Sequence, residues 1–181
     1  MGQRVWQRDA LWVAQAAVIA GLYAALTLAG YGYSFREMQF RVAEVLTLLP
    51  VFTSAAIPGL TVGCLVANLV SPLGPLDMLF GPVATLLAAL CTWLLRQKLL
   101  KGLPVLSALM PVLFNAVIVG AVITLTADGG VSFADFDLLV FFSAAGSVGG
   151  SELVICLALG MPLCVLLRKT RLFERLEVRR R

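Results

Sequence analysis

The sequence predicts an all-α membrane protein with six transmembrane helices and both termini in the cytoplasm. Hydrophobic residues make up 60% of the 181 residues and charged residues only 13%, whereas a soluble domain carries about 25% charged residues. Five long apolar runs divide the chain, and most basic residues lie between or beyond these runs. One membrane domain is therefore expected over residues 1–181.

Each span needs about 20 apolar residues to cross the bilayer core, and two of the five runs are too long for a single span. In the run over 42–70, Pro58-Gly59 predicts a break into two short helices. In the last run, the glycines within 146–150 predict a break that follows an outer loop or short interfacial helix over 133–148. The predicted spans cover residues 11–29, 43–57, 59–71, 78–95, 104–126 and 150–168.

The distribution of basic residues predicts the orientation. With six spans, both termini and the loop over 96–101 share one side of the membrane, together with twelve of the fourteen basic residues. The positive-inside rule assigns that side to the cytoplasm. With five spans, the tail and its seven basic residues would lie outside. The basic residues behind the net charge of +4 therefore lie where they orient the chain in the membrane. For this reason nucleic-acid binding is not expected.

A few polar residues interrupt the apolar spans, and on this topology they cluster in the outer half. A charge at the bilayer centre costs about 2.5–3.5 kcal/mol, so a carboxylate within a span indicates a cavity, an ion path or a partner. Glu44 and Glu152 lie near the outer starts of the second and sixth spans, and Asn115 lies midway along the fifth. These residues predict a ligand pocket in the outer half. Asp77 has a commoner role, as the cap of the fourth helix.

Each candidate ligand-binding residue also has a structural alternative. Glu44 could instead form a local ion pair with Arg41, one helical turn before it. Glu152 could cap a helix that begins at the preceding glycines, and Asn115 and Asn68 could join neighbouring helices. An aromatic side chain could stack on a planar ligand or anchor the chain at the interface. The residues predicted to contact a ligand are Glu152, Glu44, Asn115, Asn68, Arg41 and Phe40.

The first span carries small residues at every fourth position, in two adjacent registers. Small residues on a helix face let another helix approach closely. Packing within the bundle is one explanation, and the excess over two registers favours contact with another protein at least as much. The two registers are Ala16, Ala20 and Ala24, and Ala17, Gly21 and Ala25.

Several classes of function are disfavoured by the motifs that the sequence lacks. It has no G-x-x-x-x-G-K-[ST] loop for ATP, and neither G-x-S-x-G nor H-E-x-x-H. Histidine is absent, and the four cysteines lie in apolar runs without a C-x-x-C pair, so a zinc or haem site is not expected. We therefore expect no enzyme activity and no cofactor.

Several blocks of the sequence resemble the queuosine-precursor transporter (QueT) family. The most specific block is Gln39–Pro50, which reads QFRVAEVLTLLP. The resemblance extends from the first span to Arg168, with a departure at Ser151, where the pattern has glycine directly before the glutamate. The further blocks are Ala56–Leu60, Gly63–Leu69, Leu76–Gly81, Glu152–Cys156 and Leu159–Leu163.

The resemblance implies the substrate-binding S component of an energy-coupling factor (ECF) transporter, in the cytoplasmic membrane of a bacterium. Such a subunit has six membrane helices and binds a micronutrient at the outer side. It works with a membrane scaffold, the T subunit, and two cytoplasmic ATPases. The implied ligand is a 7-deazaguanine, either a precursor or a salvage form of queuosine. The face of small residues on the first span would then be the docking surface for the T subunit.

Two other classes of protein remain open from the sequence. A proton-coupled secondary transporter of a small polar or planar solute would use Glu44 or Glu152 as its titrating group and would need no ATPase. A purely structural membrane subunit would bind no small molecule. Ligand binding by the isolated chain separates the structural subunit from the other two classes, and dependence of uptake on ATP separates those two.

Overall fold

The computed structural model describes residues 2–34, 41–127, 131, 136–170 and 173. Within these residues every named element is a helix, which confirms the predicted all-α class. Four segments are long and apolar enough to cross a membrane: Asp9–Ala29, Pro75–Leu94, Val105–Leu125 and Leu138–Thr170. The elements are α1 (Gly2–Ala29), α2 (Tyr31–Ser34), η1 (Val42–Val51), α3 (Ala56–Asn68), α4 (Pro75–Leu94), α5 (Val105–Leu125), α6 (Leu138–Ile155), η2 (Cys156–Gly160) and α7 (Met161–Thr170).

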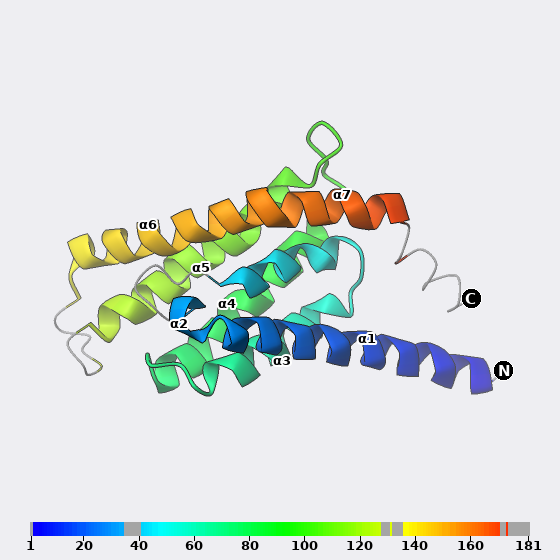
Figure 1. Ribbon diagram of the computed structural model, residues 1–181, viewed down its shortest axis with the longest axis horizontal. Helices are drawn as coiled ribbons and strands as arrows, with labels where there is room; N and C mark the ends of the chain where they lie inside the picture. The colour runs from blue at the N-terminus through cyan, green and yellow to red at the C-terminus, as the bar shows by residue number, and fades with distance from the viewer. Residues whose placement is uncertain (1, 35–40, 128–130, 132–135, 171–172, 174–181) are drawn as a thin grey trace.

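The long helices lie side by side, and the chain runs back and forth along the bundle (Figure 1). The start of α1, the turn between α4 and α5, and the end of α7 lie at one end. The turns that lead into α4 and into α6 lie at the opposite end. This arrangement gathers the basic loop and the two terminal helix ends, as the charge pattern predicts.

The run over 42–70 is divided at residues 52–55, so the predicted break at Pro58-Gly59 is wrong. Pro58 lies in the first turn of α3. Proline is tolerated there because the first N–H groups of a helix have no partner within the helix. Gly59 serves close packing instead, because a Cβ at this position would lie 2.7 Å from the carbonyl oxygen of Ala16 on α1.

The first of the two short helices, η1, is a 3₁₀ helix of ten residues. Runs of this kind longer than three or four residues are uncommon. At a rise of about 2.0 Å per residue, η1 extends about 20 Å, less than the bilayer core of about 30 Å. It packs against α1, α4 and η2. These neighbours shield the backbone of η1 from lipid, which cannot form hydrogen bonds with free N–H and C=O groups.

The last apolar run forms one uninterrupted helical segment, Leu138–Thr170. The predicted break at the glycines, and the loop or separate interfacial helix over 133–148, are therefore wrong for residues 138–148; residues 133–135 lie outside the described residues. Of these glycines, Gly149 serves close packing with α5, because a Cβ at this position would lie 3.1 Å from Cβ of Ala116. Asp137 caps the segment, and its carboxylate accepts a hydrogen bond from the N–H of Leu139 at 2.7 Å.

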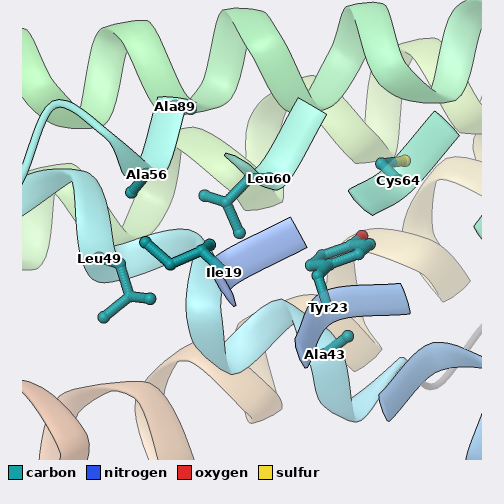
Figure 2. Close-up of a cluster of buried hydrophobic side chains, with 8 residues drawn as sticks. All are labelled: Ile19, Tyr23, Ala43, Leu49, Ala56, Leu60, Cys64 and Ala89. Carbon is teal, nitrogen blue, oxygen red and sulfur yellow. The ribbon is translucent and has the colours of Figure 1, made fainter. Parts of the chain in front are cut away.

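Two clusters of buried side chains form the core, and η1 contributes to both. The first joins α1, η1, α3 and α4 (Figure 2), and it consists of Ile19, Tyr23, Ala43, Leu49, Ala56, Leu60, Cys64 and Ala89. The second joins η1, α5, η2 and α7, and it consists of Leu48, Ala108, Cys156, Met161 and Cys164. The short 3₁₀ helix therefore connects the two halves of the bundle.

We predict that Gly63→Val destabilises the protein. A Cβ at Gly63 would lie 2.7 Å from the carbonyl oxygen of Ala20 and 2.9 Å from Cβ of Tyr23. Such overpacking costs about 1–3 kcal/mol, so the midpoint of thermal unfolding in detergent should fall by several degrees. Gly146→Val is the matched control, because none of the residues that the structure describes lies within 4 Å of a Cβ there. Equal midpoints for the two variants would show that α1 and α3 can separate without cost.

Candidate functional site

Two carboxylates that lie far apart in the sequence meet inside the bundle. Glu44 of η1 is 2% exposed and Glu152 of α6 is 4% exposed. Their side chains interact directly. Asn115 of α5 is also buried, and its side chain interacts with that of Glu152. Three residues predicted from the sequence therefore form one buried polar site between η1, α5 and α6.

One oxygen of each carboxylate in this site lacks a hydrogen-bond partner. The hydroxyl of Tyr23 donates to Oε1 of Glu44 at 2.5 Å. Oε2 of Glu44 and Oε1 of Glu152 are buried and have no partner within the part of the chain that the structure describes. Buried polar atoms are nearly always hydrogen-bonded in native proteins. The site therefore contains two carboxylate oxygens whose hydrogen-bonding capacity the described residues leave unsatisfied.

Tyr23 is the site residue that the sequence analysis missed. Its ring lies in the first core cluster beside Ala43 and Cys64 (Figure 2), and its side chain is fully buried. A hydroxyl-bearing residue in the middle of an apolar span was the only signal available. The pairing with Glu44 depends on how α1 packs against η1, which residue spacing does not reveal.

A second buried polar cluster lies at the start of α4. Arg41 pairs with Asp77, with 3.4 Å between Nη2 and Oδ2. Ser71 donates to the same Oδ2 at 2.6 Å, and the amide of Asn68 donates to the backbone oxygen of Asp77 at 2.9 Å. This cluster fixes the start of η1 to α4 and to the turn after α3. Arg41 also lies near enough to Glu44 to interact with it electrostatically.

The structure decides between several of the alternatives that the sequence left open. The ion pair found for Arg41 joins it to Asp77, across two elements, and not to Glu44 one turn away. Asp77 does not cap α4, because its carboxylate binds Arg41 and Ser71 while Gly74 occupies the cap position. Glu152 lies inside α6, whose cap is Asp137, so it has no capping role either. Phe40 lies outside the described residues.

A cleft of about 710 Å³ opens between the end of α5, the start of α6 and the turn before α4. Thr126, Ser143 and Ser147 place hydroxyl groups among its mostly apolar lining. Ser147 precedes Glu152 by five residues, which is about 7.5 Å along a helix axis. The cleft therefore lies beyond the carboxylate pair, at the end of the bundle away from the start of α1. Among the described residues, no group of His, Cys, Asp and Glu side chains is arranged to hold a metal ion.

The two small-residue registers of α1 occupy different environments. Ala24 is buried, and Ala16 and Ala20 are half-buried where α3 approaches. Ala17, Gly21 and Ala25 are exposed. A shallow groove of about 180 Å³ runs between α1 and α3, and its lining residues are Val13, Ala16, Ala17, Ala20, Pro58, Gly59 and Val62.

The comparisons with known proteins agree with these features. A family model described as QueT transporter matches residues 13–169, which include α3 to α6 and most of α1 and α7. No curated protein and no solved structure is significantly similar to the chain. The match covers far more than half of the sequence, and the four apolar helical segments fit a multi-pass membrane protein. The chain belongs to the QueT transporter family, a family of membrane transporters for queuosine precursors.

Proposed function

We propose that this chain is the substrate-binding S component of an ECF-type importer in the cytoplasmic membrane of a bacterium. It captures a queuosine precursor, or a related 7-deazaguanine, at the outer face. The observation that carries the proposal is the buried pair Glu44 and Glu152, in which Oε2 and Oε1 have no hydrogen-bond partner among the described residues. Membership of the QueT transporter family supports the class of ligand.

The hydrogen-bonding edge of a deazaguanine suits this pair. That edge presents a ring N–H and an exocyclic amine, which are both donors, and one carboxylate can accept from both through its two oxygens. We assign this role to Glu152, which lies beside Asn115. The amide of Asn115 can donate as well as accept, so it can bind the ring carbonyl or the pyrrole N–H.

The second carboxylate favours a cationic ligand. Two carboxylates in contact repel each other strongly where the dielectric constant is low. A precursor with an aminomethyl group carries a positive charge, and its ammonium group would relieve this repulsion. Glu44 is held for such a contact by the hydroxyl of Tyr23. We therefore propose that Glu44 binds the amine while Glu152 binds the base.

The energy for uptake would come from partner subunits, a scaffold T subunit and two cytoplasmic ATPases. The sequence has no P-loop of its own. In the apolar part of α1, 22% of the residues are buried. In the other three candidate spans, the share of buried residues is 33–44%. The exposed register Ala17, Gly21 and Ala25 lies on this open helix. A row of small residues facing outward lets a partner helix approach closely, so we place the T subunit there.

A proton-coupled secondary transporter is the second candidate function. The same pair favours it, because two adjacent carboxyl groups can share one proton. Uptake into vesicles that contain only this chain separates the two candidates. Uptake driven by a proton gradient without ATPases would support the second candidate and exclude the first.

We predict that Glu152→Gln weakens binding of an aminomethyl-7-deazaguanine at least tenfold, which corresponds to about 1.4 kcal/mol. The amide that replaces the carboxylate has one acceptor oxygen and an added donor, so it cannot accept from both groups of the base. Isothermal titration of the purified protein measures the affinity. Asp9→Asn is the control, because this carboxylate is exposed on α1. Wild-type affinity in Glu152→Gln would exclude the assignment.

Glu44→Gln tests the role of charge. We expect this variant to lose more affinity for the aminomethyl ligand than for a neutral 7-deazaguanine without the amine. The reason is that the lost charge–charge attraction acts only on the cation. The measurement is a pair of titrations for the wild type and for the variant. Equal losses for the two ligands would mean that Glu44 does not bind the amine.

Gly21→Leu tests the docking surface. We expect it to abolish co-purification with the T subunit and ATPases, and with it ATP-driven uptake, while the isolated subunit still binds ligand. Among the described residues, nothing lies within 4 Å of a Cβ at Gly21, so we expect the leucine to point toward lipid or a partner. Gly146→Leu is the matched control on α6, where a Cβ is equally free. A normal complex with normal uptake would exclude this register as the docking surface.

A further inference from the structure

The turn that joins α4 to α5, residues 95–104, projects sideways from the bundle next to α7 (Figure 1). Two leucines in this α4–α5 turn are exposed, Leu99 at 46% and Leu100 at 60%. Lys98 and Lys101 flank them and are exposed as well. Exposed apolar side chains beside basic ones are typical of a surface that contacts a membrane, because lysine can lie along apolar surface while its charged end stays in the polar region. The turn therefore has the side chains of a segment that rests on the surrounding bilayer.

Two arginines extend this surface on either side of the turn. The guanidinium of Arg168, on α7, donates a hydrogen bond to the backbone oxygen of Gly102 at 2.6 Å. This bond places a second cation beside Lys101. Before the turn, Arg96 stacks on Trp93, with 4.1 Å between Cζ and the ring centroid. Tryptophan is enriched where a membrane meets water, so this stacked pair marks the level of the lipid headgroups.

The charges of this region all have the same sign. Within residues 93–106 and 161–170, the charged residues are Arg96, Lys98, Lys101, Arg168 and Lys169, and all of them are basic. Neighbouring like charges repel each other, so an anion bound among them is favoured. Phosphate groups of anionic lipids are such anions, and basic pockets between membrane helices bind lipid headgroups.

The backbone conformation of Lys101 is unusual for lysine. Its φ is +51°, and among the residues that the structure describes it is the one non-glycine residue with a positive φ. Together with Gly102, whose φ is +82°, it forms the centre of a tight turn. Backbone hydrogen bonds of 2.8 and 3.0 Å between Leu100 and Leu103 close this turn. Turns with two positive φ angles prefer asparagine, aspartate or glycine at the position of Lys101. The turn geometry therefore does not favour lysine, and strained positions of this kind cluster at binding sites.

We propose that the α4–α5 turn and the end of α7 form a binding surface for the phosphate group of an anionic membrane lipid. Lys101 and Arg168 contact the phosphate, while Leu99 and Leu100 lie against the acyl chains. The surface lies at the end of the bundle opposite the cleft between α5 and α6. It is therefore separate from the buried polar site, and its role does not depend on the ligand proposed for that site.

Lys101→Asn tests this surface, because it removes the charge while asparagine suits the turn better than lysine does. Thermal unfolding in detergent is measured with added phosphatidylglycerol, which is anionic, and separately with phosphatidylcholine, which has no net charge. We expect phosphatidylglycerol to raise the unfolding midpoint of the wild type by several degrees more than phosphatidylcholine does. The variant should lose most of this difference, although without lipid its midpoint equals or exceeds that of the wild type. Native mass spectrometry should show about fivefold weaker binding of phosphatidylglycerol.

Lys101→Arg is the matched control, because it keeps the charge in the same backbone conformation and should keep the response to phosphatidylglycerol. Lys98→Gln should weaken the response without touching the tight turn, and it decides the matter if Lys101→Asn does not fold. Equal effects of the two lipids on the wild type overturn the inference, as does a wild-type response in Lys101→Asn. A full response to inorganic phosphate alone also overturns it, because the surface would then bind free phosphate. A variant that keeps the lipid response but no longer co-purifies with the ATPases would show that the surface contacts protein instead.

Discussion

The fold depends on the burial of η1, a ten-residue 3₁₀ helix, in the centre of the bundle. Its side chains join both core clusters, through Ala43 and Leu49 on one side and through Leu48 on the other. A helix this short cannot span a bilayer core of about 30 Å. Its free backbone ends must therefore be enclosed by protein. The elements α1, α4 and η2 pack against η1 and provide this enclosure.

Enclosing η1 also places Glu44 in the interior, and the rest of the site follows from its position. A buried polar atom without a partner costs about 1–3 kcal/mol, and the site contains two such carboxylate oxygens. The hydroxyl of Tyr23 satisfies only the other oxygen of Glu44, and the charge of Arg41 lies near enough to interact with this carboxyl group. The remaining cost makes the free protein less stable than an apolar core would be. It also means that a ligand with suitable donors gains more free energy on binding than it would at a solvated surface.

Those parts of the architecture that follow from composition could be predicted from the sequence. Apolar length indicated the helices, and the basic loop and tail indicated which helix ends lie together. Carboxylates in apolar spans indicated the site, because so few residues of this kind occur there. Glu44, Glu152 and Asn115 do meet. Pro58 and the glycines of the last run misled the prediction. Proline does not interrupt a helix in its first turn, and Gly149 lies where α6 packs closely against α5.

The pairings could not be predicted, because they depend on helix rotation. Arg41 is one turn from Glu44 in sequence, yet the ion pair shown for it is with Asp77 on another element. Whether Ala20 or Gly21 faces the core is a difference of about 100° around α1, and both positions hold small residues. Likewise, the π helix η2 between α6 and α7 is indicated neither by hydropathy nor by a helix-breaking residue.

The rotation of α1 also gives the two sides of this helix different surroundings. Tyr23 faces inward and holds Glu44, whereas Gly21, two residues earlier, faces outward. Two residues correspond to about 200° of rotation, so these positions lie on nearly opposite sides of the same helix. Gly59 and Gly63 of α3 let the backbones come close along the inward side. Small residues on the inward side bring Tyr23 to Glu44. Those on the outward side are exposed and form the surface at which we propose that a partner helix docks.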